Sequence, residues 1–335
     1  MKCSSGGLRA RRRSTSIMTI MRVLYCGTGD IGIPALRVLA GSAGHELAGV
    51  ITQPDRPAGR DMKPRASAIK AEALVRGLPV FQPERIRHGE SALTALGLDV
   101  MVVMAYGQIL PGSLLNIPRL GCLNLHASLL PRHRGASPIQ AAIASGDSES
   151  GITVIYMDEG LDTGDILLSD PLAIGPAETA GELHDRLAVL AAGSIVRALD
   201  LLATGAAPRV PQNDSAATYA AKLTKADGWI DWTLPCDRIE RRVRAMSPWP
   251  GAFARVAGSS AILKIHKARI SPASGPPGTV LSGGSDGILV AAGGGSLVLE
   301  EVQLEGRRRL SAPEFLRGFP IPSGSLFDLS FSVSP

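Results

Sequence analysis

The sequence has few cysteines, no clustered metal ligands and no long apolar run. Its four cysteines are scattered along 335 residues, without a CxxC pair or a histidine at metal-ligand spacing. Disulfides and a bound metal are therefore not expected, and a reducing compartment fits this pattern. No apolar run reaches the roughly 18 residues that a membrane-spanning helix needs. We therefore expect neither a membrane partner nor a metal cofactor.

Charged residues are also sparse, and acids are missing from one end of the chain. Charged side chains make up 19% of the residues and hydrophobic ones 45%, which is typical of a globular protein and excludes a disordered one. Residues 1–20 hold basic residues and no acid, and they carry the whole net charge of +5. We interpret residues 1–20 as a disordered extension, or as a stretch that lies before the true start of the protein. An organellar transit peptide is the alternative.

Strand and helix patterns alternate through residues 21–207. This alternation predicts a doubly wound, Rossmann-like α/β domain. A proline-punctuated stretch follows, which we interpret as a linker over 208–215. Over 216–330, short alternating apolar runs and glycine-rich turns predict a small β-barrel, with a helix expected over 236–245.

The first strand leads into Gly27-Thr-Gly29-Asp-Ile-Gly32, which has the G-x-G-x-x-G spacing of a dinucleotide site. Such sites also use an acid at the end of the second strand to bind the ribose. Here that strand, residues 47–52, ends in Gln53-Pro54. The missing acid argues against a nicotinamide-dependent oxidoreductase.

Two polar residues end an apolar strand within residues 120–138, LGCLNLHASLLPRHRGASP. Residues two apart on a strand face the same way, so Asn124 and His126 are expected to project together. In an open parallel sheet, ligands bind beyond the carboxyl ends of the strands. Downstream, Gly160-Leu-Asp162-Thr-Gly-Asp165 supplies a carboxylate. Considered alone, Asp162 is typical of a turn aspartate whose side chain hydrogen-bonds its own backbone. Considered with Asn124 and His126, it is a candidate member of a catalytic set.

A long polar insert follows the second expected strand. Residues 54–70 contain five basic side chains and two acids. A loop of this length inside a βα unit is usually functional or disordered, so this one is either a phosphate-binding loop or a solvated surface. The basic residues are Arg56, Arg60, Lys63, Arg65 and Lys70.

The two motifs NLHASLLPRHRGASP and GLDTGD together resemble those of the folate-dependent formyltransferases. With TQPDRPAGR at 52–60 and SPWPGAF at 247–253, the chain is similar to the branch of that family that formylates methionyl-initiator tRNA. The similarity covers about residues 21–320. Gly29 and Ile31 depart from the family's usual first turn, which has proline and an aromatic residue there.

The resemblance implies a site, two substrates and a second domain. Asn124, His126 and Asp162 match the family's catalytic residues, and Ser128, Leu129, Leu130 and Pro131 match its folate-contacting loop. It implies 10-formyltetrahydrofolate as cosubstrate, charged initiator tRNA as partner and a C-terminal barrel of the oligonucleotide-binding (OB) type. Arg60 matches the insert position most associated with tRNA. The other tRNA-binding residues expected are Arg56, Lys63, Arg241 and Arg242.

These residue types suit formyl transfer to an amine. Asn124 can donate a hydrogen bond to the oxyanion that develops on the formyl group. His126 can exchange protons near neutral pH. Asp162 can orient that imidazole or act with it through a water, and the sequence leaves both roles open.

Three other functions compete with this interpretation. A formyltransferase for an amino sugar or another small amine would share Asn124, His126 and Asp162 but would not need the basic insert together with a barrel. A non-catalytic RNA-binding protein would need the basic side chains but would have no use for Asn124, His126 and Asp162. A nicotinamide-dependent enzyme would need a ribose-binding acid at the end of the second strand, and this chain has none there. We expect a monomer in the bacterial cytoplasm, or in an organelle if residues 1–20 are a transit peptide.

Overall fold

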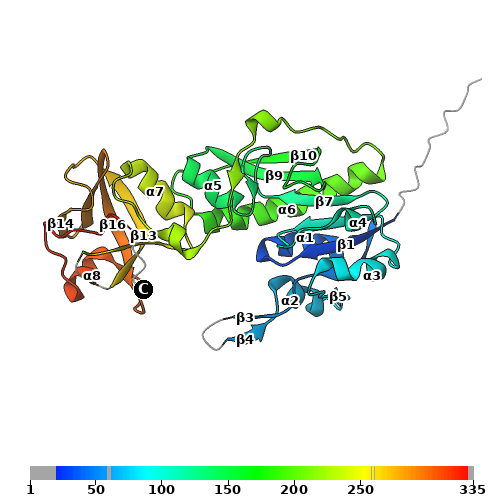
Figure 1. Cartoon of the computed structure of the whole chain (residues 1–335), viewed down its shortest axis with the longest axis horizontal. Helices are drawn as coiled ribbons and strands as arrows, with labels where there is room; N and C mark the ends of the chain where they lie inside the picture. Colours follow the sequence, from blue (N-terminus) through cyan, green and yellow to red (C-terminus); the bar gives the residue numbers. More distant parts are fainter. Residues whose placement is uncertain (1–19, 59–61, 258, 260, 331–335) are drawn as a thin grey trace, which may run out of the picture.

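The computed structural model describes residues 20–58, 62–257, 259 and 261–330. Its two halves are an α/β half and a β-rich half, which lie end to end in Figure 1. None of the helices among the described residues is long and apolar enough to cross a membrane.

The α/β half is built on a seven-stranded sheet with the order β10-β9-β7-β6-β1-β2-β5. The five strands from β7 to β5 are parallel, whereas β9 and β10 are antiparallel to their neighbours. The strands are β1 (Met21–Gly27), β2 (His45–Ile51), β5 (Val80–Phe81), β6 (Val100–Met104), β7 (Cys122–His126), β9 (Glu149–Tyr156) and β10 (Ile166–Ala173).

Helices cover both faces of this sheet. Successive side chains of a strand point to opposite faces. On β1, Val23 and Tyr25 accordingly join the core under one layer of helices, and Leu24 and Cys26 join the core under the other. The first layer contains α1 (Ile33–Ala40), α2 (Ala68–Val75), α5 (Pro138–Ser145) and α6 (Ala180–Ala203), and the second contains α3 (Glu90–Thr94) and α4 (Gly112–Leu115). This is the doubly wound arrangement that the alternating pattern predicted.

The β-rich half is an antiparallel sheet with the order β12-β13-β16-β15-β14, with β17 added to β16. The segment 325–328 bridges its two edges: Ser325 accepts a backbone hydrogen bond from Val280, and Leu326 accepts one from Ala257. The sheet therefore closes into a barrel, as predicted. Its elements are α7 (Cys236–Ala245), β12 (Ala252–Arg255), β13 (Ile262–Ser271), β14 (Val280–Gly284), β15 (Gly287–Ala292), β16 (Gly295–Leu304), β17 (Leu310–Ser311) and α8 (Ala312–Gly318).

The two halves share one hydrophobic core. Helix α7 packs against α5 on one side and against β13 on the other. Ile139 of α5, Ile239 of α7 and Leu263 of β13 belong to the same buried cluster. The barrel is therefore attached to the α/β half by side-chain packing as well as by the chain connection.

The basic insert forms a hairpin, where the sequence predicted a loop. Its strands β3 (Arg56–Ala58) and β4 (Lys63–Arg65) pair with each other alone, and Pro57 lies opposite Pro64. Proline is tolerated in such strands because each has a free edge. The hairpin projects from the α/β half in Figure 1, and its strands β3 and β4 lie on the same side of the α/β half as α2.

Two small paired segments connect the halves near the end of β7. Residues 134–135 (β8, Arg134–Gly135) pair in parallel with residues 219–220 (β11, Tyr219–Ala220). The remaining elements are short 3-10 helices: η1 (Asp30–Gly32), η2 (Ile86–Gly89), η3 (Asp214–Ala216) and η4 (Lys225–Gly228).

Candidate active site

Asn124, His126 and Asp162 converge, and we refer to them as the Asn–His–Asp trio. Strand β7 carries the first two, and the loop between β9 and β10 carries the third. The Asn124 amide nitrogen donates to Asp162 Oδ1 at 3.1 Å. His126 Nδ1 lies 3.5 Å from Asp162 Oδ2. The same carboxylate accepts the backbone N–H of Gly135 at 2.8 Å.

The imidazole of His126 is buried and oriented by a backbone group. Its Nε2 lies 2.9 Å from the carbonyl oxygen of His133. A carbonyl only accepts, so Nε2 must carry a proton, and in the neutral ring Nδ1 then has the free lone pair. This assignment directs the basic nitrogen of His126 toward Asp162.

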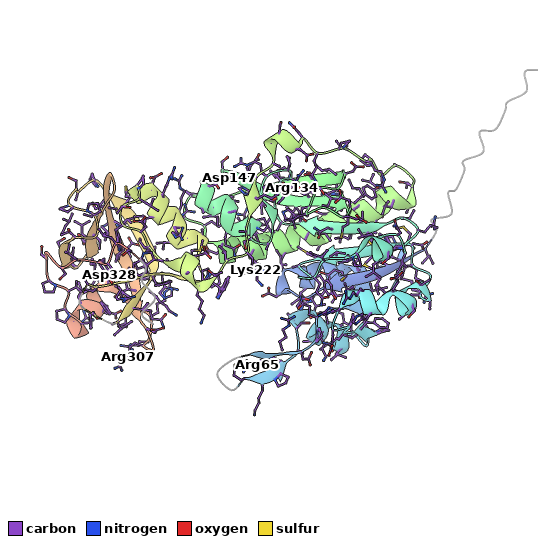
Figure 2. The ribbon with its side chains drawn as sticks, viewed as in Figure 1. Arg65, Arg134, Asp147, Lys222, Arg307 and Asp328 are labelled. Atoms are coloured by element: carbon purple, nitrogen blue, oxygen red, sulfur yellow. The ribbon has the colours of Figure 1, made fainter. Side chains whose placement is uncertain are left out.

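His133 is itself fixed on three sides. Its backbone lies in the left-handed region at φ +58°, its N–H donates to Thr218 Oγ1 at 2.8 Å, and its ring nitrogen lies 2.8 Å from Asp147 Oδ2. Figure 2 shows Asp147 and Arg134 within the α/β half, close to the junction with the barrel. These contacts hold the carbonyl that orients His126.

A pocket of about 560 Å³ opens beside the trio. Its walls include residues 105–110, which follow β6, and residues 158–162 of the loop that holds Asp162. Two apolar side chains of these loops, Ile109 and Leu161, are 87% and 58% exposed. The position, at the carboxyl end of β6, is where an open α/β sheet binds its ligand.

The predicted folate-contacting residues lie apart from the surface of this pocket. Ser128, Leu129, Leu130 and Pro131 are absent from its lining. The Ser128 hydroxyl is buried and donates to the carbonyl of Arg132 at 2.7 Å. Residues 105–110 were not among the predicted site residues, although their place after the apolar strand β6, at the carboxyl edge of the sheet, was a signal for them.

The glycine-rich turn after β1 is packed against β6. The backbone N–H groups of Thr28 and Gly29 both donate to the carbonyl of Ala105 at 3.2 Å. These donors are therefore already used, whereas a phosphate-binding turn directs them at its ligand. The occupied donors and the missing ribose-binding acid both argue against a dinucleotide site at this turn.

The predicted tRNA-binding residues lie in two places. Arg56 and Lys63 are exposed on the β3–β4 hairpin, and Arg60 lies outside the described residues. On α7, Arg241 pairs with Asp237 at 2.7 Å. Arg242 donates instead to the carbonyls of Trp229 and Asp227, at 3.0 and 2.5 Å, so it holds the chain that enters the barrel.

Cys122 is not suited to act as a nucleophile. It begins β7, at the opposite end of the strand from His126, and burial raises the pKa of its thiol to about 12. A thiol with that pKa stays protonated at neutral pH and is a poor nucleophile. Among the residues that the structure describes, no group of three His, Cys, Asp or Glu is placed to hold a metal ion.

Comparisons with known proteins agree with this geometry. The family model described as "Formyl transferase" matches residues 21–199, and "Formyl transferase, C-terminal domain" matches residues 222–320. The chain belongs to the formyl transferase family. Its two matched regions correspond to the α/β half and the barrel.

Relatives within the formyl transferase family align with nearly the whole chain. A methionyl-tRNA formyltransferase of Aromatoleum aromaticum is 49% identical over 92% of this chain and 97% of its own length. One of Geobacter sulfurreducens is 45% identical over 94% of this chain and 99% of its own. HypX from Aquifex aeolicus, solved in complex with tetrahydrofolic acid, shares the fold with a TM-score of 0.60 and 16% identity, over 89% of this chain and 47% of that one.

Proposed function

We propose that this chain transfers the formyl group of 10-formyltetrahydrofolate to the α-amine of methionyl-initiator tRNA, giving N-formylmethionyl-tRNA for translation initiation. The observation that carries the proposal is the match, over both halves, to relatives named methionyl-tRNA formyltransferase. The Asn–His–Asp trio beside a pocket supplies the chemistry. The cell compartment that we propose is the bacterial cytoplasm, and the working unit is a monomer.

In the proposed reaction the α-amine attacks the formyl carbon. A C–N bond forms to the amine, the bond from the formyl carbon to N10 of the folate breaks, and the amine's proton ends on N10. The Asn124 amide has two N–H groups, of which one is bonded to Asp162. The other can donate to the oxyanion, and losing such a donor typically costs about 3 kcal/mol of transition-state stabilisation.

His126 is the proposed acid and base. With its Nε2 proton on the His133 carbonyl, Nδ1 is the atom that takes the proton of the attacking amine. The Asp162 carboxylate at 3.5 Å stabilises the imidazolium that results, or holds a water between them. The pocket beside the trio is the proposed folate site. Ser128, Leu129, Leu130 and Pro131, which directly follow its lining residues 124–127, remain the proposed folate-contacting loop.

The tRNA-binding surface that we propose combines the hairpin and the barrel. Arg56, Arg60 and Lys63 bind the acceptor end by contacts to phosphates, which position a nucleic acid without reading its bases. Figure 2 shows Arg65 on the hairpin and Arg307 on the barrel along the same edge of the molecule. On α7, Arg241 is a further proposed tRNA contact, and Arg242 holds the chain that enters the barrel. The proposed domains are 21–207 for catalysis, 208–215 as linker and 216–330 for tRNA.

An assay with three acceptors tests the proposed function. Purified protein is incubated with 10-formyltetrahydrofolate and charged initiator tRNA, uncharged initiator tRNA or an amino-sugar nucleotide. We expect formylmethionine on the charged tRNA alone. Transfer to the amino sugar without transfer to charged tRNA would contradict the proposal.

A further inference from the structure

Gln212 connects the segment between the two halves to the loop that carries Asp162. Its amide nitrogen donates to the carbonyl of Asp162 at 2.8 Å and to that of Gly164 at 2.7 Å. Its amide oxygen accepts from Arg134 Nη2 at 2.8 Å and Nε at 3.2 Å. Both ends of this side chain are therefore engaged, with partners far from it in sequence.

Asp162 depends on such outside contacts for its conformation. It occupies the left-handed region at φ +56°, which non-glycine residues rarely adopt and which the surroundings must maintain. The loop around it belongs to no helix or strand, and Gly160 and Gly164 flank it closely. The carboxylate is held by Asn124 and by the N–H of Gly135. Gln212 holds the backbone of the same residue.

Gln212 also connects the two sides of this attachment. Arg134 is 2% exposed and precedes Gly135, whose N–H donates to Asp162. Because Gln212 bonds Arg134 with its oxygen and the Asp162 loop with its nitrogen, it fixes the distance between the loop and the Gly135 donor. A side chain that lacks either a donor or an acceptor cannot make both contacts.

We infer that Gln212 is a positioning residue for formyl transfer: it acts through Asp162, whose carboxylate it holds beside His126 and Asn124. The inference rests on the proposed function. Gln212 lies in the segment 208–215 that leads to the barrel, so the placement of the catalytic carboxylate depends on this connecting segment.

The variant Gln212→Met tests the inference because methionine keeps the length of the side chain and removes its donor and acceptor. We expect kcat for charged tRNA to fall by about 10- to 100-fold, the decrease typical of a misplaced catalytic group. The KM values for tRNA and for folate should stay within about twofold, because Gln212 lines neither substrate's proposed site.

The matched control is Asp214→Asn. Asp214 is another partner of Arg134, at 2.7 Å, and its side chain is 81% exposed. This variant weakens the attachment of Arg134 and leaves Gln212 bonded to the Asp162 loop. We expect its kcat to stay within about twofold of wild type, and thermal unfolding of both variants measures any decrease in stability. If Gln212→Met does not fold, Gln212→Glu, which keeps an acceptor for Arg134, replaces it under the same criteria.

Amide hydrogen exchange at Gly135 gives a second readout that does not depend on activity. The Gly135 N–H is bonded to Asp162, so its exchange should quicken by about 10-fold in Gln212→Met and stay unchanged in Asp214→Asn. An unchanged kcat in Gln212→Met, a decrease equal to that of Asp214→Asn, or unchanged Gly135 exchange would each overturn the inference. If wild-type protein transfers no formyl group, the proposed function fails, while the exchange measurement still decides whether Gln212 anchors Asp162.

Discussion

At the scale of single residues, the site depends on which nitrogen of His126 holds its proton. The carbonyl of His133 fixes the proton on Nε2, so Nδ1 is left as the basic atom beside Asp162. Two residues that are not catalytic, His133 and Gly135, therefore determine how the trio is arranged. Their contribution is made by backbone atoms.

Replacement of His126 tests this arrangement. We expect His126→Ala to lower kcat by about 10²- to 10⁴-fold, the usual contribution of an acid–base group. The affinity for charged tRNA, measured by filter binding, should change less than about twofold, because His126 is buried and touches no proposed tRNA surface. The matched control is His88→Ala, an exposed histidine of the same half. An equal decrease in both variants, or weaker tRNA binding in His126→Ala alone, would contradict the assigned role.

The sequence was sufficient to predict the placement of some of these residues but not of others. Strand alternation predicted that Asn124 and His126 project together, and the structure has them facing one carboxylate. Gln212 left no signal, because its amide nitrogen donates to backbone carbonyls 48 and 50 residues away and its amide oxygen accepts from Arg134, 78 residues away. Every residue has a backbone carbonyl, so the sequence does not show which carbonyl a side chain will reach, and only the folded structure does.

At the scale of elements, the β3–β4 hairpin carries the proposed tRNA-binding residues of the insert. It projects from the α/β half, and its strands pair only with each other. Arg56 and Lys63 are exposed on it. A small projecting element with exposed basic side chains can follow a phosphate backbone without disturbing the core.

The double variant Arg56→Ala/Lys63→Ala should weaken the use of tRNA without changing the chemistry. We expect KM for charged tRNA to rise and the slope of log affinity against log salt to fall by about one for each phosphate that the variant no longer binds. Formylation rates at saturating tRNA should change little. The control is Arg87→Ala, an exposed arginine outside the hairpin. An unchanged KM and salt slope would remove Arg56 and Lys63 from the tRNA surface, and Arg60→Ala would then test the rest of the insert.

An ion-pair network between α1 and α2 predicts how stability depends on pH. Glu72 accepts from Arg37 at 2.9 Å and from Arg76 at 2.8 Å. The two guanidinium groups lower the pKa of Glu72 from 4.5 to about 2. A lowered carboxyl pKa stabilises the folded state above the unfolded pKa, and this stabilisation is lost as the pH falls toward the folded pKa.

We therefore expect Glu72→Gln to lower the free energy of unfolding at pH 7 by about 1 kcal/mol, since partly exposed pairs contribute little more. The difference from wild type should shrink as the pH falls from about 4.5 to about 2. Urea unfolding at a series of pH values measures it, with Glu84→Gln as an exposed control. A difference that persists at the lowest pH would assign the effect to packing.

Helix α7 shows the limit of sequence reasoning at this scale. Its predicted bounds, 236–245, coincide with those of the structure. Arg241 and Arg242 were predicted together as tRNA-binding residues, but Arg242 bonds the carbonyls of Asp227 and Trp229. The apolar period of a helix identifies its buried face, yet it does not show which neighbouring arginine reaches a backbone carbonyl.

At the scale of the whole molecule, the sequence predicted both halves but not how they are joined. Alternating strands and helices indicated the α/β half, and short runs between glycine-rich turns indicated the barrel. The closure of that barrel by residues 325–328 and the core shared through α5 and α7 depend on contacts between distant segments. Such contacts have no local pattern. They bring the barrel, the linker and the Asp162 loop into one connected structure.

That connection is the basis of the central claim, namely that the acceptor is a charged tRNA rather than a small amine. Binding energy from remote parts of a substrate can be used to raise the rate at the reacting group. If the hairpin and the barrel supply such energy, a methionine ester without tRNA should react poorly even though its amine is the same.

The most direct measurement compares kcat/KM for formyl transfer to charged initiator tRNA and to methionine methyl ester, with 10-formyltetrahydrofolate as donor in both. We predict that the value for charged tRNA is larger by at least about 1000-fold. Comparable values for the two acceptors would contradict the account, because the trio would then act on the amine without any use of the tRNA.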